Sequence, residues 1–169
     1  MPEPSPWVAR HAPRIRDGGI VLDVAAGSGR HASFFRERGH PVVAVDRGVS
    51  RLVDLAELPA TRVVQADLEA QAWPFTAERF DGIIVTNYLH RPLLPLLADA
   101  LSAGGVLIYE TFAEGNERYG RPSNPDFLLR EGELEEVFAP LLTVLEYEHR
   151  YVAEPKPAVR QGICAIRER

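Results

Sequence analysis

The stretch Val21-Leu-Asp-Val-Ala-Ala-Gly-Ser-Gly29 decides the fold class of this chain. It lies in an apolar run that begins at Gly19, reaches an acid at Asp23 and turns at two glycines. Such a run predicts a strand buried on both faces, and the helical pattern at 29–38 predicts the helix after it. Glycines in this turn let the backbone approach a ligand, and the helix N-terminus offers free N–H groups.

The same strand–helix alternation continues along the chain. Apolar runs at 41–46, 62–67, 80–87 and 105–110 predict four more strands. Helical spacing predicts one helix capped by Ser50, a second that begins near Pro92 and a third over 134–141. We therefore expect one α/β domain over residues 1–169, with helices on both faces of a mostly parallel sheet.

The C-terminal part follows a different pattern. The strand-like runs 142–151 and 159–166 are joined only by the short connection 153–158. A connection this short cannot make a parallel crossover, so this pair is predicted to be antiparallel.

Composition narrows the function classes. The 169 residues are 46% hydrophobic and 25% charged, which excludes global disorder. The single cysteine, Cys164, excludes a disulfide framework and a cysteine-rich zinc site, and we expect no metal and a buried thiol. The net charge of −5 counts against a nucleic-acid partner. Without a secretory signal or an apolar run of about 18 residues, we expect a cytoplasmic protein that does not enter a membrane.

Polar side chains stand where four of the predicted strands end. They are Asp23, Asp46, Asp67 and Asn87. Ligands of open α/β sheets bind outside the carboxyl ends of the strands. These four residues are therefore predicted to share one site with the glycine turn.

These motifs together resemble those of class I S-adenosylmethionine-dependent methyltransferases. The stretch 21–29 resembles the first family motif, and the others follow in order as Val43–Asp46, Gln65–Leu68, Phe80–Val85 and Leu101–Leu107. The resemblance covers residues 20–166. It implies a Rossmann-like methyltransferase domain with strand order 3-2-1-4-5-7-6 and one antiparallel strand. Glu110–Ala113 and Phe127–Leu134 are similar to the small-molecule branch that includes tellurite-resistance methyltransferases.

The resemblance also implies the cofactor, S-adenosylmethionine, and the residues that bind it. Asp46 would accept hydrogen bonds from the ribose hydroxyls, and Asp67 with the Leu68 N–H would meet the adenine. Asp23 would help to place the amino-acid moiety, directly or through water. Asn87 would lie near the sulfonium.

The glycine turn contains one departure from the family pattern. Gly27 and Gly29 match it, but Ala25 stands where the family usually has its first glycine. Its methyl group is tolerated if φ at this residue is negative.

Methyl transfer from a sulfonium is an in-line displacement, so the protein mainly aligns the acceptor and excludes water. No protein nucleophile is needed. We expect a small-molecule acceptor, and Tyr88, His90 and Tyr119, in predicted loops over the strand ends, are candidates for handling its proton. His90 has an alternative role as a cap of the helix near Pro92.

Two segments outside the motifs are candidates for covering the site. Residues 113–127 are rich in glycine and proline and are predicted to form a lid loop that presents Tyr119 and Arg121 to an acceptor. The alternative is a passive loop. The N-terminal segment 1–17 is predicted to hold a short helix over 7–15, which covers the cofactor or packs on the sheet.

Other interpretations are weighed against these. Gly27–Ala32 with Asp46 also fits the dinucleotide pattern, but Asp67 would then have no role and the chain has no room for a catalytic domain. Asn87-Tyr88 can be compared with the Asn-Pro-Pro-Tyr motif of enzymes that methylate amino groups of nucleic acids. The two prolines of that motif are missing here, which argues against such an enzyme. A non-catalytic protein that binds S-adenosylmethionine or S-adenosylhomocysteine is the main rival. His11, His40 and His149 show no partner pattern and are predicted at the surface.

Overall fold

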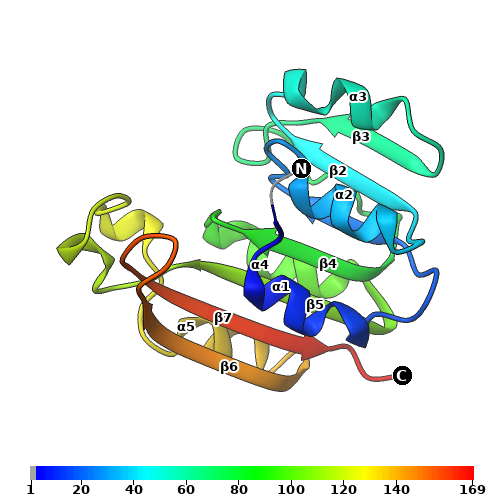
Figure 1. Cartoon of the computed structure of the whole chain (residues 1–169). Helices are drawn as coiled ribbons and strands as arrows, with labels where there is room; N and C mark the ends of the chain where they lie inside the picture. The colour runs from blue at the N-terminus through cyan, green and yellow to red at the C-terminus, as the bar shows by residue number, and fades with distance from the viewer. Residues whose placement is uncertain (1–2) are drawn as a thin grey trace.

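The sheet has the predicted strand order. A computed structural model describes residues 3–169 and contains one seven-stranded sheet, ordered β3-β2-β1-β4-β5-β7-β6 (Figure 1). The strands are β1 (Val21–Val24), β2 (Val42–Asp46), β3 (Thr61–Gln65), β4 (Phe80–Thr86), β5 (Leu101–Phe112), β6 (Thr143–Val152) and β7 (Ala158–Ile166). The first five strands pair in parallel, and β7 pairs antiparallel with both β5 and β6.

The helices are short. The α-helices are α1 (Pro6–His11), α2 (Arg30–Glu37), α3 (Val53–Ala56), α4 (Leu94–Asp99) and α5 (Glu133–Phe138). Single turns of 3₁₀-helix are η1 (Ala12–Arg14), η2 (Ser50–Leu52), η3 (Arg91–Leu93), η4 (Asn116–Arg118) and η5 (Pro125–Phe127). The predicted capping by Ser50 is wrong, because Ser50 is itself in η2 and its N-cap residue, Val49, makes no side-chain cap bond. Pro92 lies in η3, and α4 begins at Leu94.

Helices cover both faces of the sheet. Leu22 and Val24 of β1 point into a core with α4 and α5, whereas Val21 points into a second core with α1 and α2. Successive strand residues alternate between the two cores because side chains in a strand point to opposite faces. Burial on both faces explains why the strands are continuous apolar runs.

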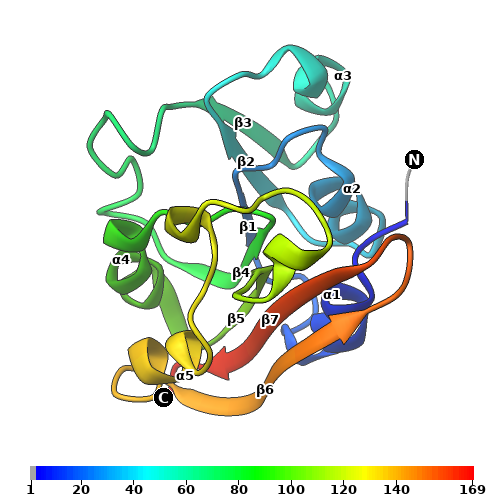
Figure 2. The ribbon, with the colours of Figure 1, turned by 90° about the vertical axis from the view of Figure 1, so that its left-hand side faces the viewer.

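The carboxyl ends of the five parallel strands lie at one edge of the sheet, which Figure 2 views directly. Because β7 runs the opposite way, its first residues lie at this same edge. Residues 113–127 cross in front of the edge, between α4 and the β6–β7 connection (Figure 2).

The N-terminal segment packs on the sheet. Trp7 of α1 is 1% exposed, and its indole donates a hydrogen bond to the Ile163 carbonyl over 3.3 Å. A Cβ atom on Gly162 would lie 2.8 Å from the Trp7 ring, so β7 has a glycine where α1 crosses it. Residues 1–2 of the predicted N-terminal segment lie outside the described residues.

Two histidines predicted at the surface are buried, so that prediction was wrong for them. His11 lies with its Nε2 2.7 Å from Glu146 Oε2, and His40 Nδ1 lies 2.8 Å from the Gly19 carbonyl oxygen. Their partners are 135 and 21 residues away in sequence, so no local pattern indicated them. Cys164 is buried as predicted, and burial raises the pKa of its thiol to about 12. Within residues 3–169, no helix combines the length and apolarity needed to span a membrane.

Candidate functional site

The glycine turn joins β1 to α2 and is fixed by backbone hydrogen bonds. The Ala26 N–H donates to the Val45 carbonyl over 3.0 Å, and the Gly29 N–H donates to the Ala26 carbonyl over 2.9 Å. Gly27 and Gly29 adopt φ of +58° and +80°, which favour glycine. A Cβ on Gly29 would also lie 2.8 Å from a Leu52 methyl carbon, so this glycine allows α2 to begin close to η2.

Ala25 adopts a conformation that the sequence interpretation did not allow for. Its φ is +55°, whereas the methyl group was expected to be tolerated at a negative φ. A non-glycine residue in this region has its Cβ close to its own carbonyl oxygen, which costs about 1–2 kcal/mol. The turn therefore retains a strained residue beside the predicted cofactor position.

Asp46 ends β2 directly beside the turn. One carboxylate oxygen accepts the Gly27 N–H over 2.9 Å, and the other accepts the Gly48 N–H over 3.0 Å. Each carboxylate oxygen has two lone pairs, so both keep one for a further donor. This half-buried, fixed carboxylate fits a pair of ribose hydroxyls.

Asp67 and Leu68 come just after β3, the strand that lies beside β2. The Ala66 N–H donates to the Asp46 carbonyl over 3.0 Å, which sets the two strand ends side by side. Asp67 Oδ1 accepts the Glu69 N–H over 3.0 Å, and the Leu68 N–H makes no hydrogen bond within the described residues. An open acceptor beside an open donor suits the edge of an adenine ring.

Asp23 lies beneath the turn and not on its surface. Its side chain is 1% exposed, and Oδ2 accepts the Ala32 N–H of α2 over 3.0 Å. Burial raises the pKa of Asp23 to about 7, although the bond from Ala32 and the Arg30 charge oppose this shift. Its structural contact is therefore with the turn and the helix start.

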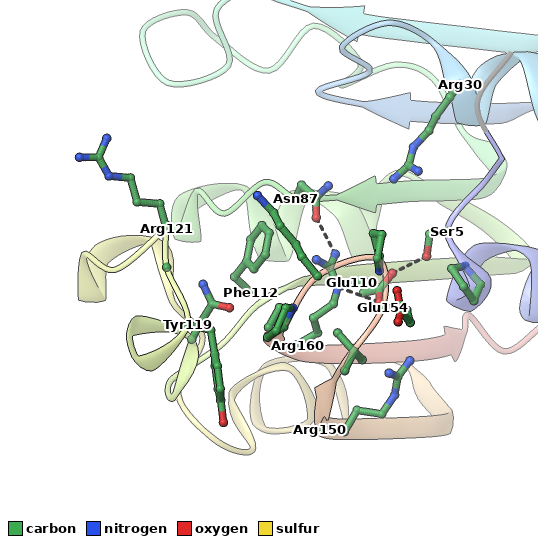
Figure 3. Close-up of a pocket in the computed structure, with 18 residues that line it drawn as sticks. Ser5, Arg30, Asn87, Glu110, Phe112, Tyr119, Arg121, Arg150, Glu154 and Arg160 are labelled. Atoms are coloured by element: carbon green, nitrogen blue, oxygen red, sulfur yellow. Dashed lines mark hydrogen bonds and ion pairs between the residues drawn. The ribbon is translucent and has the colours of Figure 1, made fainter.

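Asn87 follows β4 with φ of +55°. Its backbone N–H donates to the Glu110 carbonyl over 3.0 Å, and its Oδ1 accepts from Arg160 Nη2 over 2.5 Å. Arg160 Nε also donates to Glu110 Oε1 over 2.9 Å, and the other Glu110 oxygen accepts the Ser5 hydroxyl. Figure 3 shows this chain of four side chains, which come from four separate segments.

Glu110, Arg160 and Ser5 were missed as site residues in the sequence. Glu110 lies near the carboxyl end of β5, the same kind of position as the four strand ends that were selected. Arg160 could have been found from the antiparallel prediction, because the start of β7 had to lie at the site edge. Nothing in the sequence indicated Ser5.

His31 of α2 connects the N-terminal segment to the end of β4. Its Nε2 accepts the Ser5 backbone N–H over 3.0 Å, and its Nδ1 lies 3.3 Å from the Thr86 hydroxyl. Burial, with the Arg30 charge, lowers the pKa of His31 to about 4. His31 is therefore neutral at physiological pH and serves as a hydrogen-bond acceptor.

The three candidate proton-handling residues do not form one group. The Tyr88 hydroxyl donates to Glu69 over 3.3 Å, and His90 Nδ1 lies 3.8 Å from the same carboxylate. Burial and the nearby Glu69 charge raise the pKa of Tyr88, so its phenol stays protonated. Tyr119 is on the other side of the edge, with its ring 5.1 Å from that of Tyr151. Glu69 is a further residue that the sequence interpretation missed.

A cavity of about 440 Å³ opens beside Asn87. It is bounded by Ser5, the end of β5, residues 119–121 and the β6–β7 connection 152–158 (Figure 3). Asn87, Tyr119 and Arg121 are the predicted site residues that line it. The cavity has room for a small organic molecule, since ligand pockets are typically about 300–1,000 Å³.

Residues 113–127 are more ordered than the predicted loop. They contain η4 and η5, and the buried Asn116 side chain accepts the Val159 N–H over 3.1 Å and donates to the Pro122 carbonyl over 2.9 Å. Arg91 holds the far end by donating to the Asp126 and Leu128 carbonyls over 3.1 and 2.9 Å. The tip at 117–121 is exposed and lies beside the cavity.

The donors and acceptors at the strand ends fit the cofactor that the sequence implied. They offer a carboxylate for two hydroxyls, an acceptor–donor pair for adenine, and a glycine turn with room for a ligand, because a Cβ on Gly27 would meet nothing closer than 3.7 Å. Residues 3–169 contain no group of three or more His, Cys, Asp or Glu side chains arranged to hold a metal ion.

Comparison with known proteins agrees with this geometry. A family model described as a methyltransferase domain matches residues 2–137. The protein-L-isoaspartate O-methyltransferase of Rhodopseudomonas palustris (strain BisB5) is 35% identical over 100 residues, which are 56% of this chain and 45% of that relative. The chain thus spans less than half the length of this curated relative.

Solved structures share the fold. TehB from Haemophilus influenzae superposes with a TM-score of 0.77 at 19% identity, covering 94% of this chain and 61% of that one. The 1,6-didemethyltoxoflavin-N1-methyltransferase of Burkholderia thailandensis was solved with 1,6-didemethyltoxoflavin and S-adenosylhomocysteine. It superposes with a TM-score of 0.72 at 23% identity, covering 97% of this chain and 77% of that one. The family match confirms the methyltransferase resemblance seen in the sequence. Because the family model covers most of its length, this chain belongs to the methyltransferase domain family.

Proposed function

We propose that this chain transfers the methyl group of S-adenosylmethionine to a small molecule bound in the cavity beside Asn87. The observation that carries the proposal is the continuity of the site. The glycine turn, Asp46 and Asp67 follow one another along the sheet edge, and Asn87 connects that edge to the cavity.

The chain's own residues have separate tasks in this proposal. When bound, S-adenosylmethionine supplies the electrophilic methyl group. Asp46 binds the ribose, Asp67 and the Leu68 N–H bind the adenine, and Asn87 lies beside the reacting centre. Asp23 acts indirectly, by holding the start of α2 against the turn.

Proton handling is divided between the two sides of the edge. Tyr119 lines the acceptor cavity, whereas Tyr88 and His90 adjoin Glu69 on the cofactor side. Since the phenol of Tyr88 stays protonated, Tyr88 is a hydrogen-bond donor to Glu69. Of the three candidates, Tyr119 is the one placed to meet an acceptor bound in the cavity.

We also propose that the exposed tip of residues 113–127 closes over the acceptor and excludes water. Limited trypsin cleavage after Arg118, with and without S-adenosylhomocysteine plus an acceptor, tests this. Slower cleavage with both ligands supports a lid. Equal cleavage, together with unchanged turnover in Tyr119→Phe, contradicts it.

Calorimetry tests the cofactor assignment. S-adenosylmethionine should bind and NADH should not. Asp46→Ala should weaken binding by about tenfold or more, because charge-assisted hydrogen bonds contribute about 1.5–3 kcal/mol each. Asp46→Asn keeps an oxygen for the Gly27 N–H and checks that the turn survives. Asp23→Asn should weaken binding less than Asp46→Ala, and the exposed Asp54→Ala is the matched control.

A screen for release of S-adenosylhomocysteine across acceptor classes separates the enzyme from its rival. Turnover with any acceptor favours the enzyme, and binding without turnover favours a non-catalytic cofactor-binding protein. The relative named for protein L-isoaspartate suggests a second acceptor class. An isoaspartyl peptide, with the aspartyl peptide of the same sequence as control, belongs in the screen. A cytoplasmic location is part of the proposal, and cell fractionation tests it.

A further inference from the structure

The acceptor cavity carries the opposite charge to the rest of the molecule. Its lining includes five cationic residues, Arg30, Arg121, Arg150, Lys156 and Arg160, and two carboxylates, Glu110 and Glu154. The chain as a whole has a net charge of −5. A cationic hollow in an acidic protein raises the local concentration of anions and favours their entry.

Arg160 is a largely buried cation of this cavity and is held by two side-chain partners. Its side chain is 16% exposed, and its guanidinium donates to both Glu110 and Asn87. It also lies over the Phe112 ring, with Cζ 4.6 Å from the centroid. Nη1 makes no hydrogen bond within the described residues. The Arg160 guanidinium is therefore fixed in position and still has free N–H donors, including those of Nη1.

Three further cations of the lining are available to a ligand. Within the described residues, Lys156, Arg121 and Arg30 have no carboxylate within 4.0 Å, whereas Arg150 pairs with Glu148. Arg30 begins α2 directly after the glycine turn, and its Nη1 donates to the Glu3 carbonyl over 3.1 Å, so it lies on the cofactor side of the cavity. Arg121 extends away from the cluster in Figure 3, at the outer side of the cavity. Lys156 is thus the second candidate for contacting an anion that binds Arg160.

The rest of the lining is largely apolar. Phe112, Val152, Pro155 and Pro157 contribute walls around the charged groups. A cavity of about 440 Å³ with such walls fits an organic molecule and is too large for a lone inorganic oxyanion.

We propose that the methyl acceptor is an organic anion with an apolar body, whose carboxylate or phosphate binds Arg160 and Lys156. This inference rests on the methyl transfer proposed above. Because Asn87 bonds to Arg160, anchoring the anion there places the acceptor next to the cofactor's reacting end. Arginine forks bind carboxylates and phosphates through paired, charge-assisted hydrogen bonds.

The test uses four ligands built on one ring: 4-hydroxybenzoate, phenyl phosphate, 4-hydroxybenzamide and 4-hydroxybenzylamine. Binding is measured by calorimetry on the full chain saturated with S-adenosylhomocysteine. One or both anions should bind at least about tenfold more tightly than the amide and the amine. Equal binding of all four, or preference for the amine, overturns the inference while leaving the methyltransferase proposal intact.

Variants locate the anion. Arg160→Gln should weaken binding of the preferred anion by about tenfold or more, and Arg160→Lys and Lys156→Gln by a smaller factor. Affinity for S-adenosylmethionine should stay within about twofold of the unmodified chain, and the exposed Arg79→Gln is the control. Loss of cofactor affinity by the same factor in Arg160→Gln and Arg160→Lys would assign Arg160 to the cofactor and overturn the inference.

The single lysine of the chain allows an independent test of contact with the anion. Lys156 is the sole lysine in the chain, so an amine-reactive reagent modifies this side chain and the N-terminal amine, which peptide mass spectrometry separates. The preferred anion should slow modification of Lys156 but not of the N-terminus. Equal modification with and without the anion contradicts contact with Lys156, even if Arg160→Gln fails to fold. Failure of the unmodified chain to bind S-adenosylmethionine would instead overturn the proposed function.

Discussion

Single residues at the strand ends determine the electrostatics and the strain of the cofactor site. Asp46 is fixed by two backbone N–H groups at the edge, whereas Asp23, two strand positions inside, is buried enough that its pKa rises to about 7. Ala25 holds a left-handed conformation between them.

Ala25→Gly should stabilise the fold. Removing Cβ relieves the strain at φ of +55°, and the greater entropy of glycine in the unfolded chain offsets part of the gain. We expect the free energy of unfolding in urea to rise by about 0.5 kcal/mol. Ala26→Gly, in the same turn but not at positive φ, should lower it. A lower stability for Ala25→Gly would show that the methyl group packs favourably.

Asp23→Asn should become more stable relative to the unmodified chain as pH rises. The carboxyl has a pKa of about 7 when folded, against an ordinary value of 3.8, so its contribution to stability is complete below about pH 4 and is lost as pH rises through 7. Asparagine cannot lose that proton. The difference in unfolding free energy should therefore grow between pH 5 and pH 8, by a few kcal/mol at most, at about 1.4 kcal/mol per pKa unit.

Urea unfolding at both pH values measures this difference. Arg30 and Asp46, which face Asp23, and His31, whose lowered pKa gives the opposite slope, are present in both proteins and cancel. The free-energy cost of burying the side-chain amide in Asp23→Asn is the same at every pH, so it does not change how the difference in unfolding free energy varies with pH. A difference independent of pH, as expected for Asp54→Asn on the surface, would contradict the raised pKa of Asp23.

Among the elements, short helices and turns at the site edge are held together by side-chain hydrogen bonds between segments that are distant in the sequence. The start of α5 carries Glu133, 2% exposed, which receives two hydrogen bonds from Arg91 of η3 over 2.7 and 3.0 Å. These bonds, with the Arg130 N–H, lower the pKa of Glu133 despite its burial. Through the same guanidinium, η3 also binds the far end of residues 113–127.

Arg91→Ala should destabilise the fold and loosen residues 113–127. It leaves the Glu133 carboxylate buried without its main partner, which we expect to cost about 1.5–3 kcal/mol in urea unfolding. Trypsin should cleave faster after Arg118 under native conditions. Arg79→Ala, which removes an exposed arginine at the opposite edge, is the control. Unchanged cleavage in Arg91→Ala would mean that the Asn116 contacts alone hold the segment.

At the scale of the whole molecule, the first helix closes onto the last strand. Trp7 of α1 covers Gly162 of β7, and Ser5, just before the helix, bonds to Glu110 at the site. The N-terminal segment thus connects the buried face of the C-terminal strands to the acceptor cavity. Stability and site geometry are coupled through this contact.

Trp7→Ala should lower the free energy of unfolding by about 3–5 kcal/mol, as for other buried aromatic side chains. Gly162→Ala should also destabilise, because its Cβ would lie 2.8 Å from the Trp7 ring. The double variant should lose less than the sum of the two, since removing the indole makes room for the new methyl group. Urea unfolding of all four proteins measures this coupling. Additive losses would show that the strain at Gly162 comes from elsewhere.

Local sequence patterns were enough to predict the strands, the glycine turn and the strand-end positions of Asp46, Asp67 and Asn87. These features depend on local patterns, namely apolar runs, helical spacing and polar residues that follow them. With the antiparallel pair and the family resemblance, they were enough to predict the observed strand order.

The packing of the elements brings together residues that are distant in the sequence. Arg160 reaches Glu110 across 50 positions and Asn87 across 73, and His11 lies beside Glu146. It also separated Tyr119 from Tyr88 and His90, gave Ala25 its positive φ, and anchored the predicted loop at Asn116. Periodicity reports only which face of its own element a residue occupies, whereas these contacts depend on how β7 and the N-terminal segment pack against β5.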